Sequence, residues 1–368
     1  MDSEEFNRKR LRFARKRRGI TIKSLGSAVG MTPKIISDYE NGKRTPPEKT
    51  LSLIAIELNF PVSFFFLDDI VTLDETAVSF RSFSKMTASV RDSALGAGQI
   101  ALEFAFWLDE RFELPSVNIP DLRDYEPEAA ASTLRDIWSL GELSVGNMIH
   151  LLESNGVRVF SLEEKTLDMD AYSFWMNGIP FVFVNNKKTV ERGRFDAAHE
   201  LGHLILHKHG SPLGREVEIE ANRFASAFLM PRGSVISKAP RFPSLDIFIE
   251  LKSNWRVATS ALVRRMNDLD LVSDWHYRSL MIELSKKWGR NKEPNPIKQR
   301  ETSKLLPMIF RLLREEGVSK KDIARDLRVF TSDIDSILFN ITLTGVGGGK
   351  NRLSPKKNSA KGHLKIIK

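Results

Sequence analysis

The apolar residues near the start of the chain fall at helical spacing, in short runs separated by glycines. Residues 7–18 place Leu11 and Ala14 on one side and basic residues on the other, which predicts a first helix. Caps, prolines and further glycines then predict three more short helices. The residues that set their bounds are Gly19, Thr21, Gly30, Thr32-Pro33, Asn41-Gly42 and Pro46-Pro47.

In the middle of the chain the apolar period changes from helical to alternating and then back to helical. Asn177-Gly178 is typical of a hairpin turn, which Ile179-Pro180 is expected to lengthen. We therefore predict a mainly α fold with a small β-sheet, of the α+β class. The expected helices are 94–112, 128–155 with a break near Gly141, 194–207 and 218–230, and the expected strands are 157–160, 171–176 and 181–184.

The last part of the chain divides into helices, a linker and a tail. Helices are expected over 244–285, and Pro294 and Pro296 indicate a linker. Residues 302–340 have the pattern of another helical bundle, either helix-turn-helix-like or used for dimerisation. Residues 345–368 hold seven lysines and arginines and no acid, which predicts a disordered basic tail. The expected domains are 1–67, 75–285, 297–340 and 345–368.

The charge is divided unevenly along the chain. Lys and Arg outnumber Asp and Glu by 13 to 6 in residues 1–50 and by 20 to 8 in residues 286–368, but residues 51–285 hold 23 against 33. Two basic ends around an acidic centre favour a polyanionic partner. The opening Met1-Asp2-Ser3-Glu4-Glu5 does not read as a signal peptide, and no apolar run approaches the length of a membrane span. We expect a cytoplasmic protein with no membrane partner.

The pattern of the N-terminal helices indicates a DNA-binding domain. A helix, a tight glycine turn and a second helix form the geometry that lays the second helix in the major groove. The motif residues are Gly19-Ile20-Thr21, Leu25, Val29-Gly30, Ile36-Ser37 and Tyr39-Glu40-Asn41-Gly42-Lys43-Arg44 followed by Pro46. On these residues, the segment 7–67 resembles the lambda-repressor-like (Cro/CI, or XRE) helix-turn-helix family.

That resemblance implies a set of DNA contacts. Thr32, Lys34 and Ser37 would sit at the exposed start of the recognition helix and meet bases or phosphates, and Lys43 and Arg44 would grip the phosphate backbone. The chain departs from the family at Ile22, where a glutamine that contacts phosphate is usual. The resemblance implies binding to an operator in double-stranded DNA as a homodimer. The alternative is a small bundle used for dimerisation or protein contact.

A second motif, His199-Glu200-Leu201-Gly202-His203, predicts a metal centre. Histidines four residues apart share one face of a helix, so both imidazoles can bind a single zinc ion, and Glu200 can act on a water activated by that metal. The chain has no cysteine, so disulfides are excluded and zinc must be held by histidine and carboxylate. A third ligand is needed, and periodicity does not choose among the downstream glutamates, which are Glu216, Glu218 and Glu220.

The surroundings of this motif resemble a peptidase family. The shared motifs are Phe80-Arg81-Ser82, the run from Phe195 to His207, Glu218-Ile219-Glu220-Ala221-Asn222-Arg223-Phe224-Ala225, and Phe228-Leu229-Met230-Pro231. On them, residues 75–285 resemble the ImmA/IrrE family of zinc metallopeptidases, with a zincin-like fold. The resemblance implies that zinc is held by His199, His203 and Glu218, with Glu220 as the alternative third ligand.

The resemblance also implies the chemistry, which is metal-assisted hydrolysis of an amide. Glu200 would take a proton from water and pass it to the leaving amine. Residues Phe181 to Val184 would form an edge strand that pairs with an extended peptide, and Tyr172 is a candidate for stabilising the oxyanion. His207 and His209 are expected to be exposed at the end of the helix, favoured by its dipole, and not to be ligands.

Together, the two resemblances predict a DNA-binding transcriptional regulator that carries a zinc metallopeptidase-like domain. That domain would either sense a signal that changes DNA occupancy or cleave a regulatory protein. One alternative is a site-specific metalloprotease that cleaves a repressor and is recruited to DNA by its helix-turn-helix. Another is an antitoxin-type autorepressor that acts by protein contact. A fourth interpretation is that metal is bound but no peptide is cut.

Overall fold

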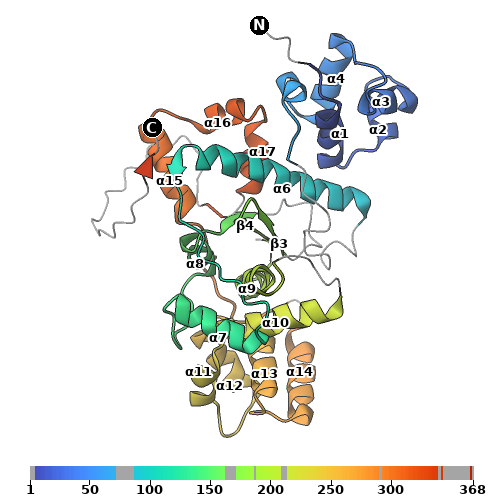
Figure 1. Ribbon diagram of the computed structural model, residues 1–368. Coiled ribbons are helices and arrows are strands. Elements are labelled where there is room, and N and C mark those ends of the chain that lie inside the picture. Colours follow the sequence, from blue (N-terminus) through green and yellow to red (C-terminus); the bar gives the residue numbers. More distant parts are fainter. Residues whose placement is uncertain are drawn as a thin grey trace.

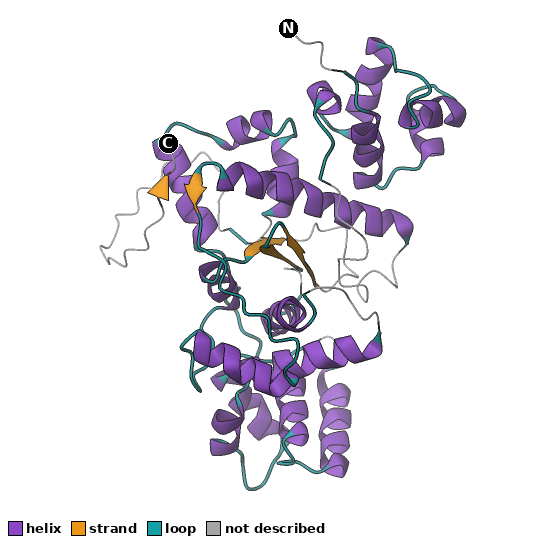
Figure 2. Cartoon of the chain, in the orientation of Figure 1, coloured by secondary structure: helices purple, strands orange, loops and turns teal. Residues whose placement is uncertain are grey.

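The structure is a computed structural model that describes residues 5–71, 87–161, 171–185, 188–208, 214–289, 292–338, 341–342 and 365–366. Helices dominate it and enclose one small sheet, as the ribbon in Figure 1 and the secondary-structure colouring in Figure 2 show. The predicted α+β class is therefore confirmed. The motif Phe80-Arg81-Ser82 and His209 lie outside the described residues.

The N-terminal helices begin and end where the caps predict. Thr21 accepts a hydrogen bond from Ser24 N at the start of the second helix, and Thr32 accepts one from Ile35 N at the start of the third, with Pro33 as its first residue. Leu11, Ile36 and other apolar residues are fully buried between the helices. The elements are α1 (Arg8–Arg17), α2 (Ile22–Ala28), α3 (Pro33–Glu40), α4 (Glu48–Leu58) and η1 (Val62–Phe66).

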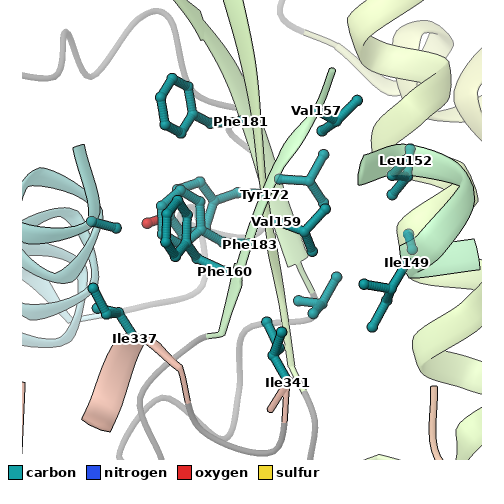
Figure 3. Close-up of a cluster of buried hydrophobic side chains, with 14 of the residues drawn as sticks. Ile149, Leu152, Val157, Val159, Phe160, Tyr172, Phe181, Phe183, Ile337 and Ile341 are labelled. Carbon is teal, nitrogen blue, oxygen red and sulfur yellow. The ribbon is translucent and has the colours of Figure 1, made fainter. Parts of the chain in front are cut away.

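A small sheet lies at the centre of the molecule, between a long helix and a second helical layer (Figure 1). Its strands are β2 (Arg158–Ser161), β3 (Ala171–Met176) and β4 (Ile179–Val184), in the order β2-β4-β3. The long helix α6 (Ala88–Asp109) covers one face, and α9 (Val190–Leu206) packs on the other. Figure 3 shows Phe160, Tyr172, Phe181 and Phe183 on the side of α6, with Val159 on the opposite side.

Two expectations about the sheet are wrong. Residues Phe181 to Val184 lie in the central strand, because β4 pairs in parallel with β2 and antiparallel with β3, so this segment has no free edge for a peptide. The hairpin is also tighter than predicted: Met176 pairs directly with Ile179 across Asn177 and Gly178, both with positive φ. Pro180 fits inside the strand as a partner of Trp175.

Helices on the far side of α9 complete the central region. Figure 1 shows α7 and α10 crossing below α9, with a further group of helices beyond them. Arg265, from this group, donates to the carbonyl of Met230 and pairs with Glu128 on α7, so the group is attached by buried polar contacts. The elements are α7 (Pro127–Ile137), α8 (Met148–Ser154), α10 (Arg215–Leu229), α11 (Arg232–Ser237), α12 (Leu245–Leu251), η3 (Lys252–Asn254), α13 (Thr259–Asp268) and α14 (Asp274–Trp288).

The C-terminal helices return to the other end of the molecule. They are α15 (Leu305–Glu315), α16 (Lys320–Asp326) and α17 (Thr331–Ile337), and α17 packs on α6 and the sheet with Ile337 fully buried (Figure 3). Within the segment predicted to be a basic tail, β5 (Lys365–Ile366) pairs antiparallel with β1 (Phe112–Glu113). Among the described helices, none combines the length and the apolar character needed to cross a membrane.

Candidate metal centre and DNA-binding surface

Helices α9 and α10 meet at a glycine, and this contact sets the geometry of the candidate metal centre. A Cβ atom at Gly202 would lie 3.0 Å from a ring carbon of Phe224 and 3.3 Å from the Cα and carbonyl oxygen of Ala221. A side chain here would require the neighbouring helix to shift by a few tenths of an ångström, so glycine favours this close approach of the two backbones. The close contact brings Glu218 on α10 to the face of α9 that carries His199 and His203.

Three side chains converge at this contact. The Nε2 atoms of His199 and His203 are 3.0 Å apart, and the carboxylate oxygens of Glu218 lie 3.5 Å from the first and 3.6 Å from the second. The exposed fractions of the three side chains are 15%, 9% and 11%. Ligand atoms around a tetrahedral zinc ion are separated by about 3.3 Å. The three groups therefore fit a zinc ion without rearrangement.

The acidity of the histidines reflects burial and the neighbouring carboxylates. Burial lowers the pKa of His203 to about 3, and the nearby His199 adds to the effect. Burial also acts to lower the pKa of His199, but its hydrogen bond with Glu218 and the surrounding carboxylates outweigh that effect and raise it. His203 is thus held as a neutral imidazole, the form that binds metal.

Glu200 is held by a residue on the sheet. Its carboxylate accepts a hydrogen bond of 2.7 Å from Ser173 Oγ on β3, and the residue is only 2% exposed. Burial raises the pKa of Glu200 to about 7, although His199 and Ser173 act in the opposite direction. A carboxylate with a pKa near neutrality can both accept and return a proton, as a general base must. Ser173 was not predicted, because its sequence context carries no motif.

Glu220, the alternative third ligand, has a different partner. Glu220 accepts from His207 Nε2 at 2.9 Å, and His207 Nδ1 lies 3.1 Å from His203 Nδ1. The side chain of His207 is only 7% exposed, so the expectation of an exposed residue at the helix end is wrong. Glu216 is exposed and is not one of the convergent residues found in the described part of the chain.

Tyr172, a candidate for stabilising the oxyanion, does not face this cluster. Its ring stacks on Phe183 with centroids 4.5 Å apart, and its hydroxyl donates to the carbonyl of Ala94 on α6. Successive residues of a strand point to opposite faces, so Tyr172 lies on the α6 side of the sheet and Ser173 on the α9 side. The tyrosine is a core residue.

The predicted DNA contacts lie together at the exposed edge of the N-terminal helices. Thr32, Lys34, Lys43 and Arg44 are exposed, and Ser37 is half-buried and accepts a hydrogen bond from the side chain of Asn41. The surface is thus open to a ligand along the start of α3 and in the turn that follows it.

Ion pairs inside the same domain hold that turn in place. Arg15 forms a two-pronged pair with the buried Glu40, with contacts of 2.5 and 2.9 Å. Arg12 donates to the side chain of Asn41 at 2.9 Å, and Arg8 donates to its carbonyl at 2.7 Å. These arginines support the fold of the turn. Lys43 is exposed, and Arg44 is also exposed, with its Nε 3.7 Å from the carboxylate of Asp38.

Comparison with protein-family models finds two matches. Residues 11–65 match the helix-turn-helix family model, and residues 152–267 match a peptidase family model described as the IrrE N-terminal-like domain. A comparison with curated proteins returns no match. Two separate segments of the chain therefore match known families, one a helix-turn-helix and the other a metallopeptidase-like domain, in the order that the motifs indicate. The second match contains β2 to β4, α9 and α10, which together carry the convergent residues.

Proposed function

We propose that this protein is a DNA-binding transcriptional regulator whose central domain binds one zinc ion and hydrolyses a peptide bond in a regulatory protein. The observation that carries the proposal is the convergence of His199, His203 and Glu218, with Glu200 buried beside them and held by Ser173. Metal binding alone would need only the three ligands, so the additional pair of Glu200 and Ser173 supports hydrolysis.

The residues divide the chemistry between them. When bound, zinc supplies Lewis-acid activation of water and of a peptide carbonyl. His199 and His203 would offer imidazole nitrogens to zinc and Glu218 would offer a carboxylate, which is a set of three protein ligands typical of catalytic zinc sites. Glu200 accepts the proton of the attacking water and returns it to the leaving amine, and Ser173 fixes the direction of its carboxylate.

The N-terminal domain supplies the link to gene control. It is α1 that packs on α6, whereas the proposed DNA contacts lie at the cap of α3, within α3 and in the turn after it; they are Thr32, Lys34, Ser37, Lys43 and Arg44. Operator DNA can thus bind while the domain stays docked. We propose that the protein binds as a homodimer and that events at the metal centre alter its DNA occupancy.

Zinc binding is tested with two glutamate variants on the same helix. Glu218→Ala removes a ligand and is expected to weaken zinc binding by at least 100-fold, whereas Glu216→Ala, at an exposed position, is expected to bind as the wild type does. The measurement is competition with a chromophoric chelator. Equal zinc affinities in the two variants would contradict the proposed ligand set.

Hydrolysis is tested separately with Glu200→Gln. This change keeps the shape of the side chain but removes the base, so cleavage of proteins encoded beside the gene should fall by 100-fold or more while zinc binding is retained. New N-termini detected by mass spectrometry report the cleavage. If wild type and Glu200→Gln regulate and cleave alike, the domain acts by binding alone and the hydrolytic part of the proposal is wrong.

A further inference from the structure

His203 belongs to a hydrogen-bonded series that continues away from the metal centre. Its Nε2 atom faces His199 and Glu218, and its Nδ1 atom lies 3.1 Å from Nδ1 of His207. His207 in turn places Nε2 at 2.9 Å from Glu220. Both nitrogens of His207 are therefore engaged, and neither points to the convergent atoms.

Only one placement of protons satisfies every contact in this series. A neutral imidazole carries one N–H, so if Nε2 of His203 offers its lone pair to a cation, its proton must be on Nδ1. That N–H donates to Nδ1 of His207, which must then be an acceptor. The proton of His207 is left on Nε2 and donates to the Glu220 carboxylate.

The two ligand histidines differ in this respect. Nδ1 of His199 is buried and has no hydrogen-bond partner among the residues that the structure describes. His203 is thus the one whose ring orientation and tautomer are set by neighbours. A histidine ligand that donates its second N–H to a further acceptor is oriented by that bond and becomes a better electron donor.

We propose that His207 and Glu220 are positioning residues that hold His203 in its metal-binding tautomer. This inference rests on the proposed zinc site and deepens it. It also gives separate roles to the two glutamates between which the sequence did not choose: Glu218 faces the convergent nitrogens directly, and Glu220 acts through His207.

The test is the zinc affinity of the full chain, measured by chelator competition. His207→Phe keeps a ring but removes both nitrogens, and Glu220→Ala removes the terminal acceptor. Each is expected to weaken zinc binding, His207→Phe by about 10–100-fold and Glu220→Ala by less. Because Glu220 acts through His207, the double variant should bind zinc no more weakly than His207→Phe alone. Glu216→Ala on the same helix is the control.

The melting temperature and the pattern of zinc affinities distinguish a loss of positioning from a loss of folding. The melting temperature of the metal-free protein should be nearly unchanged in Glu220→Ala, whose side chain is 47% exposed, so that a loss of affinity there cannot be attributed to unfolding. Unchanged zinc affinity in both single variants, or additive losses in the double variant, would overturn the inference while leaving the zinc site intact. A wild-type chain that binds no zinc would overturn the proposed function together with this inference.

Discussion

At the scale of single residues, the local motifs were readable and the residues that support them were not. Spacing alone identifies the motif of His199, Glu200 and His203, because a helix brings positions four apart to one face. Ser173 is 27 positions from Glu200 and reaches it only because β3 packs on α9. No local pattern encodes a hydrogen bond of that kind, so it could not be predicted.

Ser173 yields a prediction about catalysis. Ser173→Ala removes the donor to the Glu200 carboxylate, so the base loses its orientation, and cleavage is expected to fall by about 10–100-fold with zinc affinity unchanged. Ser237→Ala, at an exposed position on a distant helix, is the matched control. Cleavage rate and zinc affinity are measured on the same preparations. A parallel loss of both would show that Ser173 serves the fold and not the base.

The exposed basic residues yield a prediction about DNA. Lys43→Ala and Arg44→Ala should each weaken binding to a duplex selected from a random library, and each should reduce the slope of log affinity against log salt by about 1. The same loss is expected for unrelated duplexes, since phosphate contacts carry no sequence information. Lys238→Ala, at the exposed end of α11, should leave the salt slope unchanged. Loss restricted to one sequence would contradict a phosphate role.

At the scale of elements, the bounds of the N-terminal helices followed from caps and turns. The start of α6 at Ala88 and of α9 at Val190 lies several residues before the predicted one, and the order of the strands was not predicted. Three strands were predicted, yet their alternating pattern does not state which one is central. In the order β2-β4-β3, the segment Phe181 to Val184 lies in the middle strand. Strand β2 pairs with one edge of β4 in parallel, and β3 pairs with the other edge through the hairpin. Strand order depends on long-range pairing, which a single sequence does not contain.

The contact between α9 and α10 gives the element-scale prediction. Gly202→Ala must push α10 from α9, which is expected to cost about 1–3 kcal/mol of stability and to weaken zinc binding, because Glu218 moves with α10. Gly193→Ala, on the same helix, meets only the carbonyl of Asn185 at 3.9 Å.

The control change should therefore stabilise the protein by about 0.5–1 kcal/mol through helix propensity and leave zinc affinity unaltered. Chemical denaturation and chelator competition measure the two quantities. Equal zinc affinity in the two glycine variants would mean that the packing of α10 does not position Glu218.

At the scale of the whole molecule, the C-terminal segment connects the metal centre to the DNA-binding domain. At one end Glu301 pairs with Arg194, five positions before His199 on α9, and accepts from the backbone N–H of Met148 at 2.8 Å. At the other end Asp333 on α17 pairs with Arg18 of the N-terminal domain at 2.7 Å. This segment was predicted as a separate bundle, and its linking contacts lie between residues that are from 107 to 315 positions apart.

The pair between Arg18 and Asp333 gives the whole-molecule prediction. The Asp333 side chain is 1% exposed, so Asp333→Ala leaves a partly buried arginine without its carboxylate and should loosen the N-terminal domain. Amide hydrogen exchange in residues 5–71 is expected to speed up by about tenfold or more. Asp335→Ala, on the same helix, breaks only an exposed pair with Lys320 and should have little effect. Equal exchange in the two variants would mean that the domain is held by other contacts.

We propose that two imidazoles and one carboxylate hold zinc in this chain. X-ray absorption spectroscopy at the zinc edge of the full-length protein, reconstituted with one equivalent of zinc, tests it most directly. The expected spectrum shows a four-coordinate shell of nitrogen and oxygen at about 2.0 Å with the outer scattering of two imidazoles. A shell of oxygens without imidazole scattering, or an unchanged spectrum in Glu218→Ala, would contradict it.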